Sequence, residues 1–170
     1  MSPPSPPLTP LAAAVLALRA PESVLEIQCG EGDGALFLAR EFPRARVRGI
    51  DGSAEAIRRA TARVGLDPEG RVAFKVGGPR SLPFPDDHFD LVAALDVSPG
   101  AAEVARVLRP GGHLILAYAS AGGAPRGLRA KLSRWRLSRA GIEPVSAALA
   151  GDGSFSVGRL RGGDLGPRSV

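Results

Sequence analysis

The fold of this 170-residue chain is decided by the stretch Val24-Leu25-Glu26-Ile27-Gln28-Cys29-Gly30-Glu31-Gly32-Asp33-Gly34. Its first four residues form a short apolar run typical of a buried strand, and the closely spaced glycines permit a tight turn. Residues 35–42 then carry apolar side chains at helical spacing and stop before Pro43. A strand, a glycine turn and a helix in this order let backbone N–H groups approach a ligand.

The same alternation of strand and helix continues along the chain. We expect strands at 24–27, 45–50, 71–76, 89–95, 113–119, 144–149 and 155–160, and helices at 11–19, 35–42, 53–64, 99–108 and 126–139. This pattern predicts an α/β fold with a parallel sheet and helices on both faces. The short connection between the last two strands predicts an antiparallel hairpin at one edge.

Prolines and capping residues indicate where the elements begin. Thr9 and Pro10 suit the N-cap and first position of the first helix, and Ser53 suits the N-cap of the third. We expect a disordered proline-rich lead-in at 1–10, a single domain at 11–161 and a loose tail at 162–170.

Composition indicates a soluble globular protein with 44% hydrophobic and 23% charged residues. The lone Cys29 excludes an intramolecular disulfide and favours a reducing cytoplasm. No apolar run near the start approaches the ~20 residues that span a bilayer. The protein is therefore expected to be cytoplasmic, without a membrane partner.

The net charge of +5 comes almost wholly from arginine, and genome base composition is the simplest explanation for it. Arginines gather in the helix at 126–139, where Leu128, Leu132 and Trp135 share one side. We expect that side to pack against the sheet and the arginines to form a solvated face. Contact of these arginines with nucleic acid or lipid is a less favoured alternative.

Three interpretations of the glycine turn compete. Residues 30–35 satisfy the dinucleotide pattern G-x-G-x-x-G/A, with Asp51 about twenty residues further on. A tight turn that holds no ligand is a second possibility. The third is a turn that binds S-adenosylmethionine. The carboxylates of Glu26, Glu31 and Asp33 would repel a pyrophosphate but tolerate the sulfonium and ammonium of this cofactor, so charge favours the third interpretation. Asp51 either accepts both ribose hydroxyls or serves as a turn residue before the next helix.

Several motifs together make the chain resemble the class I S-adenosylmethionine-dependent methyltransferases, most closely the small-molecule branch that includes ubiquinone/menaquinone C-methyltransferases. The similarity rests on the glycine turn at 24–34, Gly49-Ile50-Asp51-Gly52-Ser53, the LPFPDDHFD segment at 82–90, the E-x-x-R-V-L-R-P-G-G segment at 103–112 and AGIEPV at 140–145. The resemblance implies a Rossmann-like fold with a mostly parallel seven-stranded sheet, an antiparallel edge strand and bound S-adenosyl-L-methionine.

The resemblance also implies cofactor-binding residues at the carboxyl ends of the strands. Glu26, Gln28 and the backbone of Gly30 and Gly32 would cradle the methionine part of the cofactor. Asp51 and Gly52 would lie at the ribose, the turn Gly78-Pro79-Arg80 would flank the adenine, and Leu95 would pass near the amino-acid end.

Two positions depart from the family pattern. Gln28 replaces the first glycine of the turn, and Gly78 replaces the acid that accepts the adenine amino hydrogen bond. Each change weakens cofactor binding by about one hydrogen bond, ~1 kcal/mol. We expect methyl transfer to a small-molecule acceptor, with a degenerate member that binds without catalysis as the alternative. A nucleotide-dependent oxidoreductase and an RNA methyltransferase are less favoured.

No residue is assigned a catalytic role, because in-line methyl transfer requires mainly alignment of the reactants. Asp96, just after the fourth strand, is either a general base or a loop-capping carboxylate, and capping is preferred. His88 is expected to be an exposed bystander, His113 to be structural and Cys29 to be a packing residue. The cysteine and histidines lack ligand spacing, so no metal site is predicted.

Overall fold

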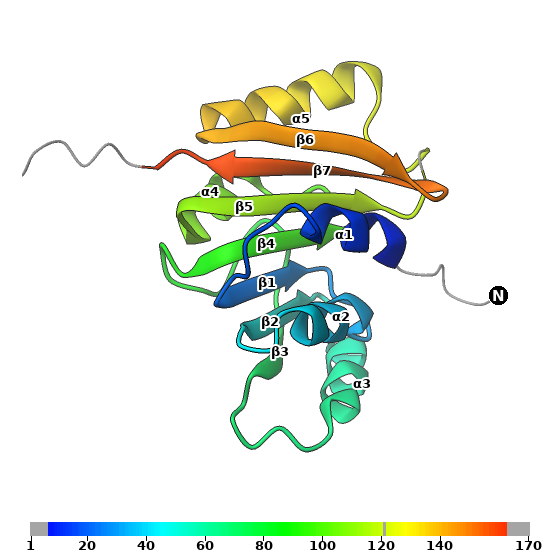
Figure 1. Ribbon diagram of the computed structural model, residues 1–170, viewed down its shortest axis with the longest axis vertical. Coiled ribbons are helices and arrows are strands. Elements are labelled where there is room, and N and C mark those ends of the chain that lie inside the picture. The colour runs from blue at the N-terminus through cyan, green and yellow to red at the C-terminus, as the bar shows by residue number, and fades with distance from the viewer. Residues whose placement is uncertain (1–6, 121, 163–170) are drawn as a thin grey trace, which may run out of the picture.

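The computed structural model describes residues 7–120 and 122–162, which form one seven-stranded sheet and five helices (Figure 1). The strands are β1 Ser23–Ile27, β2 Arg46–Asp51, β3 Val72–Val76, β4 Phe89–Leu95, β5 Leu108–Tyr118, β6 Ile142–Ala150 and β7 Gly153–Leu160. The helices are α1 Leu8–Val15, α2 Asp33–Glu41, α3 Ala54–Val64, α4 Ala101–Val107 and α5 Gly127–Arg139.

The sheet has the strand order β3-β2-β1-β4-β5-β7-β6. β1 to β5 pair in parallel, whereas β7 runs antiparallel to both β5 and β6. The predicted mostly parallel sheet and its antiparallel hairpin are therefore confirmed. Because the first five strands run in the same direction, their carboxyl ends meet at one edge of the sheet.

Both faces of the central strands are buried. Val24 and Leu91 pack in the cluster that α1 and α2 cover, while Leu25 and Val92 point into the cluster that α4 covers. These four side chains are at most 1% exposed. A strand buried on both faces needs a continuous apolar run, and this explains the pattern of β1 and β4.

Several element boundaries differ from the sequence prediction. α1 begins at Leu8 rather than residue 11, with Pro7 at the N-cap, so Thr9 lies inside the helix and does not cap it. Pro10 is tolerated because the first turn has no intrahelical partners for its N–H groups. Ser53 caps α3 as predicted, accepting from the Ala56 N–H at 3.2 Å. The expected disordered lead-in at 1–10 is wrong for residues 8–10, which form the start of α1. Residues 1–6 of that lead-in, and 163–170 of the expected tail at 162–170, lie outside the described residues.

β5 and β6 are longer than predicted. β5 begins at Leu108, directly after α4, because Phe89 of β4 pairs with Leu108. A shift of register between Phe89 and Leu91 accommodates the Pro-Gly-Gly segment, which lies between the helix expected at 99–108 and the strand expected at 113–119. β6 begins at Ile142 and contains Pro144 on the outermost strand, where a missing N–H donor is tolerated.

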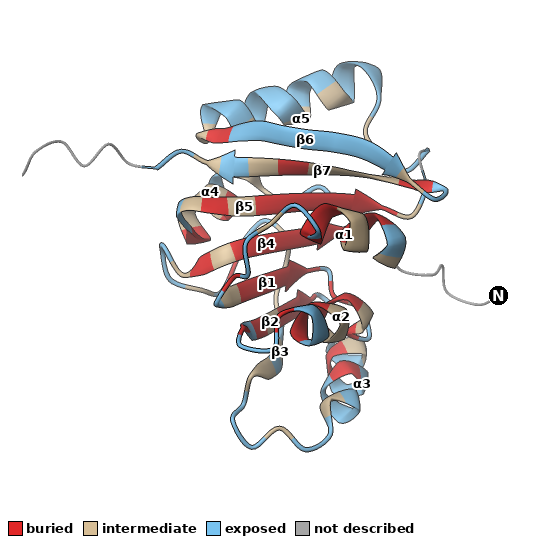
Figure 2. Cartoon of the chain, viewed as in Figure 1, coloured by how far each residue is buried: buried red, intermediate tan, exposed pale blue. Residues whose placement is uncertain are grey.

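The predicted packing of α5 is wrong. Leu128 and Trp135 are 81% and 54% exposed, and no residue of α5 is buried. Figure 2 shows both α5 and most of β6 in the exposed colour. Ala130, Ser133 and Leu137 instead lie toward the sheet, across a cavity of about 910 Å³ that α5 and the strands β5, β7 and β6 enclose. The stripe of larger apolar side chains is on the opposite side of the helix.

Candidate functional site at the strand ends

The glycine turn follows β1 with a backbone that ordinary residues rarely adopt. Gly30 and Gly32 have φ of +53° and +88°, and Gln28 has φ of +63°. A residue with a β-carbon is strained in this left-handed region, so Gln28 occupies a position suited to glycine. Its side chain is exposed and therefore takes no part in the packing beneath the turn. Asp96, after the neighbouring β4, also has positive φ, +53°.

The glycines of the site have two different roles. A β-carbon added to Gly30, Gly52 or Gly78 would meet no atom within 4 Å, so the backbone at these three turns borders open space. A β-carbon on Gly32 would instead lie 2.8 Å from the Phe74 ring. Gly34 is similarly closed in by Glu26. The first group can admit a ligand against the main chain, whereas the second shapes the turn by close internal packing.

Asp51 connects two of these turns. Its Oδ2 accepts from the Gly30 N–H at 3.0 Å, and its Oδ1 accepts from the Ser53 N–H at 2.8 Å. The alternative role as a turn residue is therefore observed. Each carboxylate oxygen has a second lone pair, so these bonds leave acceptor capacity for ribose hydroxyls.

Glu26 is the last residue but one of β1, beneath the turn, and is only 1% exposed. Burial is the main reason that its pKa rises from 4.5 to about 8; the N–H of Ala35 lowers it, while the carboxylates of Asp33 and Asp51 raise it further. Its Oε2 has no hydrogen-bond partner among the described residues, and none of the ion pairs between them includes Glu26. A buried carboxyl group with one unpartnered oxygen is costly and favours a cationic or donor ligand beside it.

The other two carboxylates of the turn are already neutralised. Glu31 pairs with Arg59 and Asp33 pairs with Arg63, each at 2.8 Å, and both arginines belong to α3. Because both groups are paired, they do not favour a sulfonium cofactor by their charge as expected from the sequence. Only Glu26 keeps that role, because sequence could not show that the arginine face of α3 lies against the turn.

The turn at Gly78-Pro79-Arg80 lies beside the start of α4. The Gly100 N–H donates to the carbonyl of Pro79, and the Gly77 N–H donates to that of Asp51, each at 3.0 Å. These bonds join the ends of β2 and β3 to the loop after β4. The predicted glycine, ribose and adenine segments are thus brought to one edge of the sheet. Leu95 is different, because its side chain is buried in the core beside Gly34.

The residues considered for a catalytic role, an aspartate, a cysteine and two histidines, have surroundings that suit a structural role. Asp96 accepts from the Ala119 N–H at 2.9 Å, so it ties the end of β4 to the end of β5 as a capping carboxylate. Cys29 is buried, and burial raises the pKa of its thiol above the usual range, which makes it unreactive. His88 was expected to be exposed but is half-buried, and its ring stands edge-on to the Phe89 ring with centres 4.8 Å apart. Burial and Arg159 lower the pKa of His113.

A sequence profile for the family described as a methyltransferase domain matches residues 24–112. The chain belongs to this family. The match begins at β1 and ends in β5, so it covers the glycine turn, Asp51 and the adenine turn. The predicted membership of the class I S-adenosylmethionine-dependent methyltransferases is confirmed, and with it the family's cofactor.

Named relatives agree with this assignment. The methyltransferase domain is 35% identical over 166 residues to 27-O-demethylrifamycin SV methyltransferase of Amycolatopsis mediterranei, covering 82% of this chain and 61% of the relative. It is 34% identical over 102 residues to a ubiquinone/menaquinone biosynthesis C-methyltransferase of Geobacter sulfurreducens, covering 55% and 40%. The chain therefore spans about three fifths or less of these two relatives.

A solved structure has the same fold. A SAM-dependent methyltransferase from Aquifex aeolicus superposes with a TM-score of 0.71 at 17% identity, covering 88% of each chain. At this identity the likeness shows the Rossmann-like fold alone. None of the described helices has both the length and the apolar character needed to cross a membrane.

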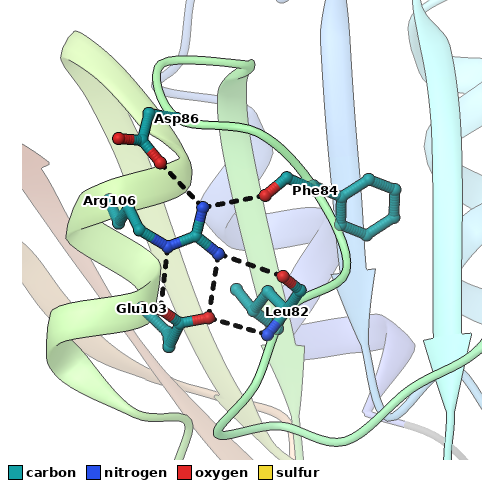
Figure 3. A network of polar contacts seen from close by, with 5 residues as sticks. All are labelled: Leu82, Phe84, Asp86, Glu103 and Arg106. Atoms are coloured by element: carbon teal, nitrogen blue, oxygen red, sulfur yellow. Dashed lines mark hydrogen bonds and ion pairs between the residues drawn. The ribbon is translucent and has the colours of Figure 1, made fainter.

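Two further motifs of the methyltransferase domain form a clamp away from the turn (Figure 3). Arg106 of α4 pairs with Glu103 at 2.8 Å and with Asp86 at 2.9 Å, and it donates to the carbonyls of Leu82 and Phe84. Glu103 also accepts from the Leu82 N–H, and Arg106 holds the pKa of Glu103 at about 2. The LPF and E-x-x-R motifs thus hold the loop before β4 on α4, a role that the sequence did not indicate.

Proposed function

We propose that this methyltransferase domain binds S-adenosylmethionine at the carboxyl ends of β1, β2 and β3 and methylates a small-molecule acceptor. The observation that carries the proposal is Glu26, a buried carboxyl group with an unpartnered oxygen beneath a turn whose backbone borders open space. When bound, the cofactor supplies an electrophilic methyl group on its sulfonium. The residues present fit a ligand of this kind, because it carries cationic groups and no phosphate.

The chain's own groups would divide the binding between them. Glu26 would ionise opposite the cationic amino-acid end, because a nearby positive charge favours the carboxylate. Asp51 would accept from the ribose hydroxyls while it keeps its bonds to the two turns. Gly30, Gly52 and Gly78 would allow close approach of the ligand to the main chain, and Arg80 and Pro79 would flank the adenine. Gln28 would lie at the rim of the site.

The cavity beneath α5 supports an apolar acceptor. It is lined by Leu116, Leu137 and Ile142, and it reaches Tyr118 at the carboxyl end of β5. Tyr118 adjoins Ala119, which is bonded to Asp96 at the end of β4. The acceptor would approach the methyl group from this side, and Asp96 is the carboxylate placed to take up a proton if the acceptor is acidic.

A buried thiol without a disulfide partner supports a reducing compartment. We therefore propose that the protein works in the cytoplasm.

Calorimetric titration with S-adenosylmethionine, S-adenosylhomocysteine and NAD tests the cofactor. The first two should bind and NAD should not. Asp51→Ala should weaken binding by about tenfold to a hundredfold, the equivalent of hydrogen bonds to a charged group. Asp152→Ala, at an exposed position of the β6–β7 turn, is the control and should bind as the wild type does. Absence of heat with both cofactor forms would refute the proposal.

Proton release tests the role of Glu26 in the same titration. Near pH 7 the free domain holds a proton on Glu26, because its pKa is about 8, and binding of a cation should release that proton. Titrations in buffers of different ionisation enthalpy should therefore show proton release for the wild type and none for Glu26→Gln. Transfer of a radiolabelled methyl group to a small-molecule extract then tests catalysis; binding without transfer would indicate a degenerate member.

A further inference from the structure

The positive charge of the whole chain is concentrated on and beside α5. Residues 126–139 carry six arginines and lysines and no acid, whereas the rest of the chain has 16 basic and 17 acidic residues. From residue 104 to residue 142 there is no Asp or Glu at all. The net charge of +5 is therefore a local property of this segment rather than a general basic character.

The outward side of α5 carries large apolar side chains that the sheet does not cover. Leu128, Leu132 and Trp135 recur at helical spacing and are 81%, 42% and 54% exposed. The guanidinium carbon of Arg139 lies 5.0 Å from the centre of the Trp135 ring, so a cation stands at the carboxyl end of this stripe. Figure 1 places α5 beyond β6 at the outer edge of the molecule.

Basic side chains flank the apolar stripe on both sides. At 100° per residue, Arg129 and Arg136 lie on one side of the stripe and Lys131 lies on the other. All three are exposed, and the ion pairs between described residues all lie outside α5. An apolar stripe bordered by cations is the pattern of a helix that lies in the interface of a membrane.

We propose that α5 docks this domain on an anionic lipid surface, with the apolar stripe inserted and the flanking cations at the phosphates. Leu128, Leu132 and Trp135 would leave water for the boundary of the acyl chains. Packing of α5 against α5 of a second copy would bring like charges together, so self-association would leave the cations of α5 without partners of opposite charge. A nucleic acid would pair with the cations but would leave the leucines in contact with water. Only the lipid interface uses both features.

Trp135 is the single tryptophan of the chain, so its fluorescence reports on α5 without a label. We expect its emission to shift to shorter wavelength with vesicles of phosphatidylcholine and phosphatidylglycerol, and to stay unchanged with phosphatidylcholine alone. Raised salt should reduce the binding, because anionic lipids attract the cations. The measurement requires neither cofactor nor acceptor, so its result is independent of the proposed methyl transfer.

Charge variants separate the effect of the α5 cations on vesicle binding from the effect of the net charge of the protein. Replacing Arg129, Lys131 and Arg136 by Gln should weaken vesicle binding by about a hundredfold, from about fivefold for each cation. The matched control replaces Arg40, Arg44 and Arg46 by Gln, which removes the same charge from exposed positions elsewhere. The control should bind vesicles as the wild type does.

Leucine variants test the insertion. Leu128→Ser should weaken binding by about tenfold or more, whereas Leu66→Ser, at a fully exposed loop leucine, should not weaken it. The proposal is overturned by equal binding to both kinds of vesicle, or by none. A Trp135 shift with transfer RNA but not with vesicles would assign the surface to nucleic acid, and a shift on concentrating the protein alone would assign it to a second copy.

Discussion

The centre of the sheet and its β6 edge are built differently. Leu25 of β1 is fully buried, and the strands beside it are covered on both faces by helices. Leu149 of β6 is 74% exposed, and α5 next to it has no buried residue. The contrast extends to charge: Glu31, Asp33 and Glu103 each face an arginine, whereas the cations of α5 take no part in the ion pairs between described residues. Stability therefore resides in the β1–β4 part, and the α5 edge is free to serve contacts with other molecules.

The largest expected difference between the two parts is in pH dependence. Glu26 holds its proton up to about pH 8 in the folded chain but only to about 4.5 when unfolded. The contribution of Glu26 to the free energy of unfolding should thus be fully present below pH 4.5. Between pH 4.5 and about 8 the free energy of unfolding should fall by about 1.4 kcal/mol for each pH unit. Denaturant unfolding of Glu26→Gln across this range should lack that fall.

Glu143→Gln in β6 is the control for this experiment, because the Glu143 side chain is 55% exposed. It should keep the pH dependence of the wild type. Identical pH profiles for the wild type and Glu26→Gln would show that the buried carboxyl does not control stability.

A matched pair of leucines compares packing directly. Leu25→Ala should lower the free energy of unfolding by about 3 kcal/mol, because it removes buried methyl groups and leaves a cavity. Leu149→Ala should change it by less than about 0.5 kcal/mol, as usual for an exposed site. Urea titrations of both variants provide the measurement, and similar losses would contradict the distinction between the two parts.

A matched pair of arginines compares the charges. Arg106→Met should lower the free energy of unfolding by about 2 kcal/mol, because the carboxylate of Glu103 and the carbonyl of Phe84 lose a charged donor. Arg129→Met removes an exposed cation of α5 and should leave stability unchanged within about 0.5 kcal/mol. Thermal unfolding measures both, and an equal effect would mean that the clamp adds nothing to the fold.

The smallest expected effect concerns the strained residue of the turn. Gln28→Gly should raise the free energy of unfolding by up to about 1 kcal/mol, because glycine adopts φ of +63° without a clash of its β-carbon. Gln28→Ala keeps the β-carbon and should give no gain. Chemical denaturation of the two variants separates relief of backbone strain from loss of the side chain.

Local patterns predicted much of the fold and part of the site. The apolar run of β1, the glycines after it and the cap at Ser53 are short-range features, and each has the predicted structure. Asp51 and Gly78 were placed at one edge because parallel strands bring their carboxyl ends together. The pairing of Glu31 and Asp33 with arginines was not predictable, since their partners Arg59 and Arg63 are about thirty residues away in sequence.

The sequence by itself determined the order of the elements, the glycine turn and the concentration of cations at residues 126–139, because periodicity and composition are properties of neighbouring residues. Tertiary structure decided which groups remain without a partner. Leu128 and Trp135 have the spacing of a buried stripe, but the sheet reaches only the opposite side of α5, so they face solvent. Glu26 likewise keeps one buried oxygen without a partner among the described residues, because the strands around it exclude water and bring no described cation to it.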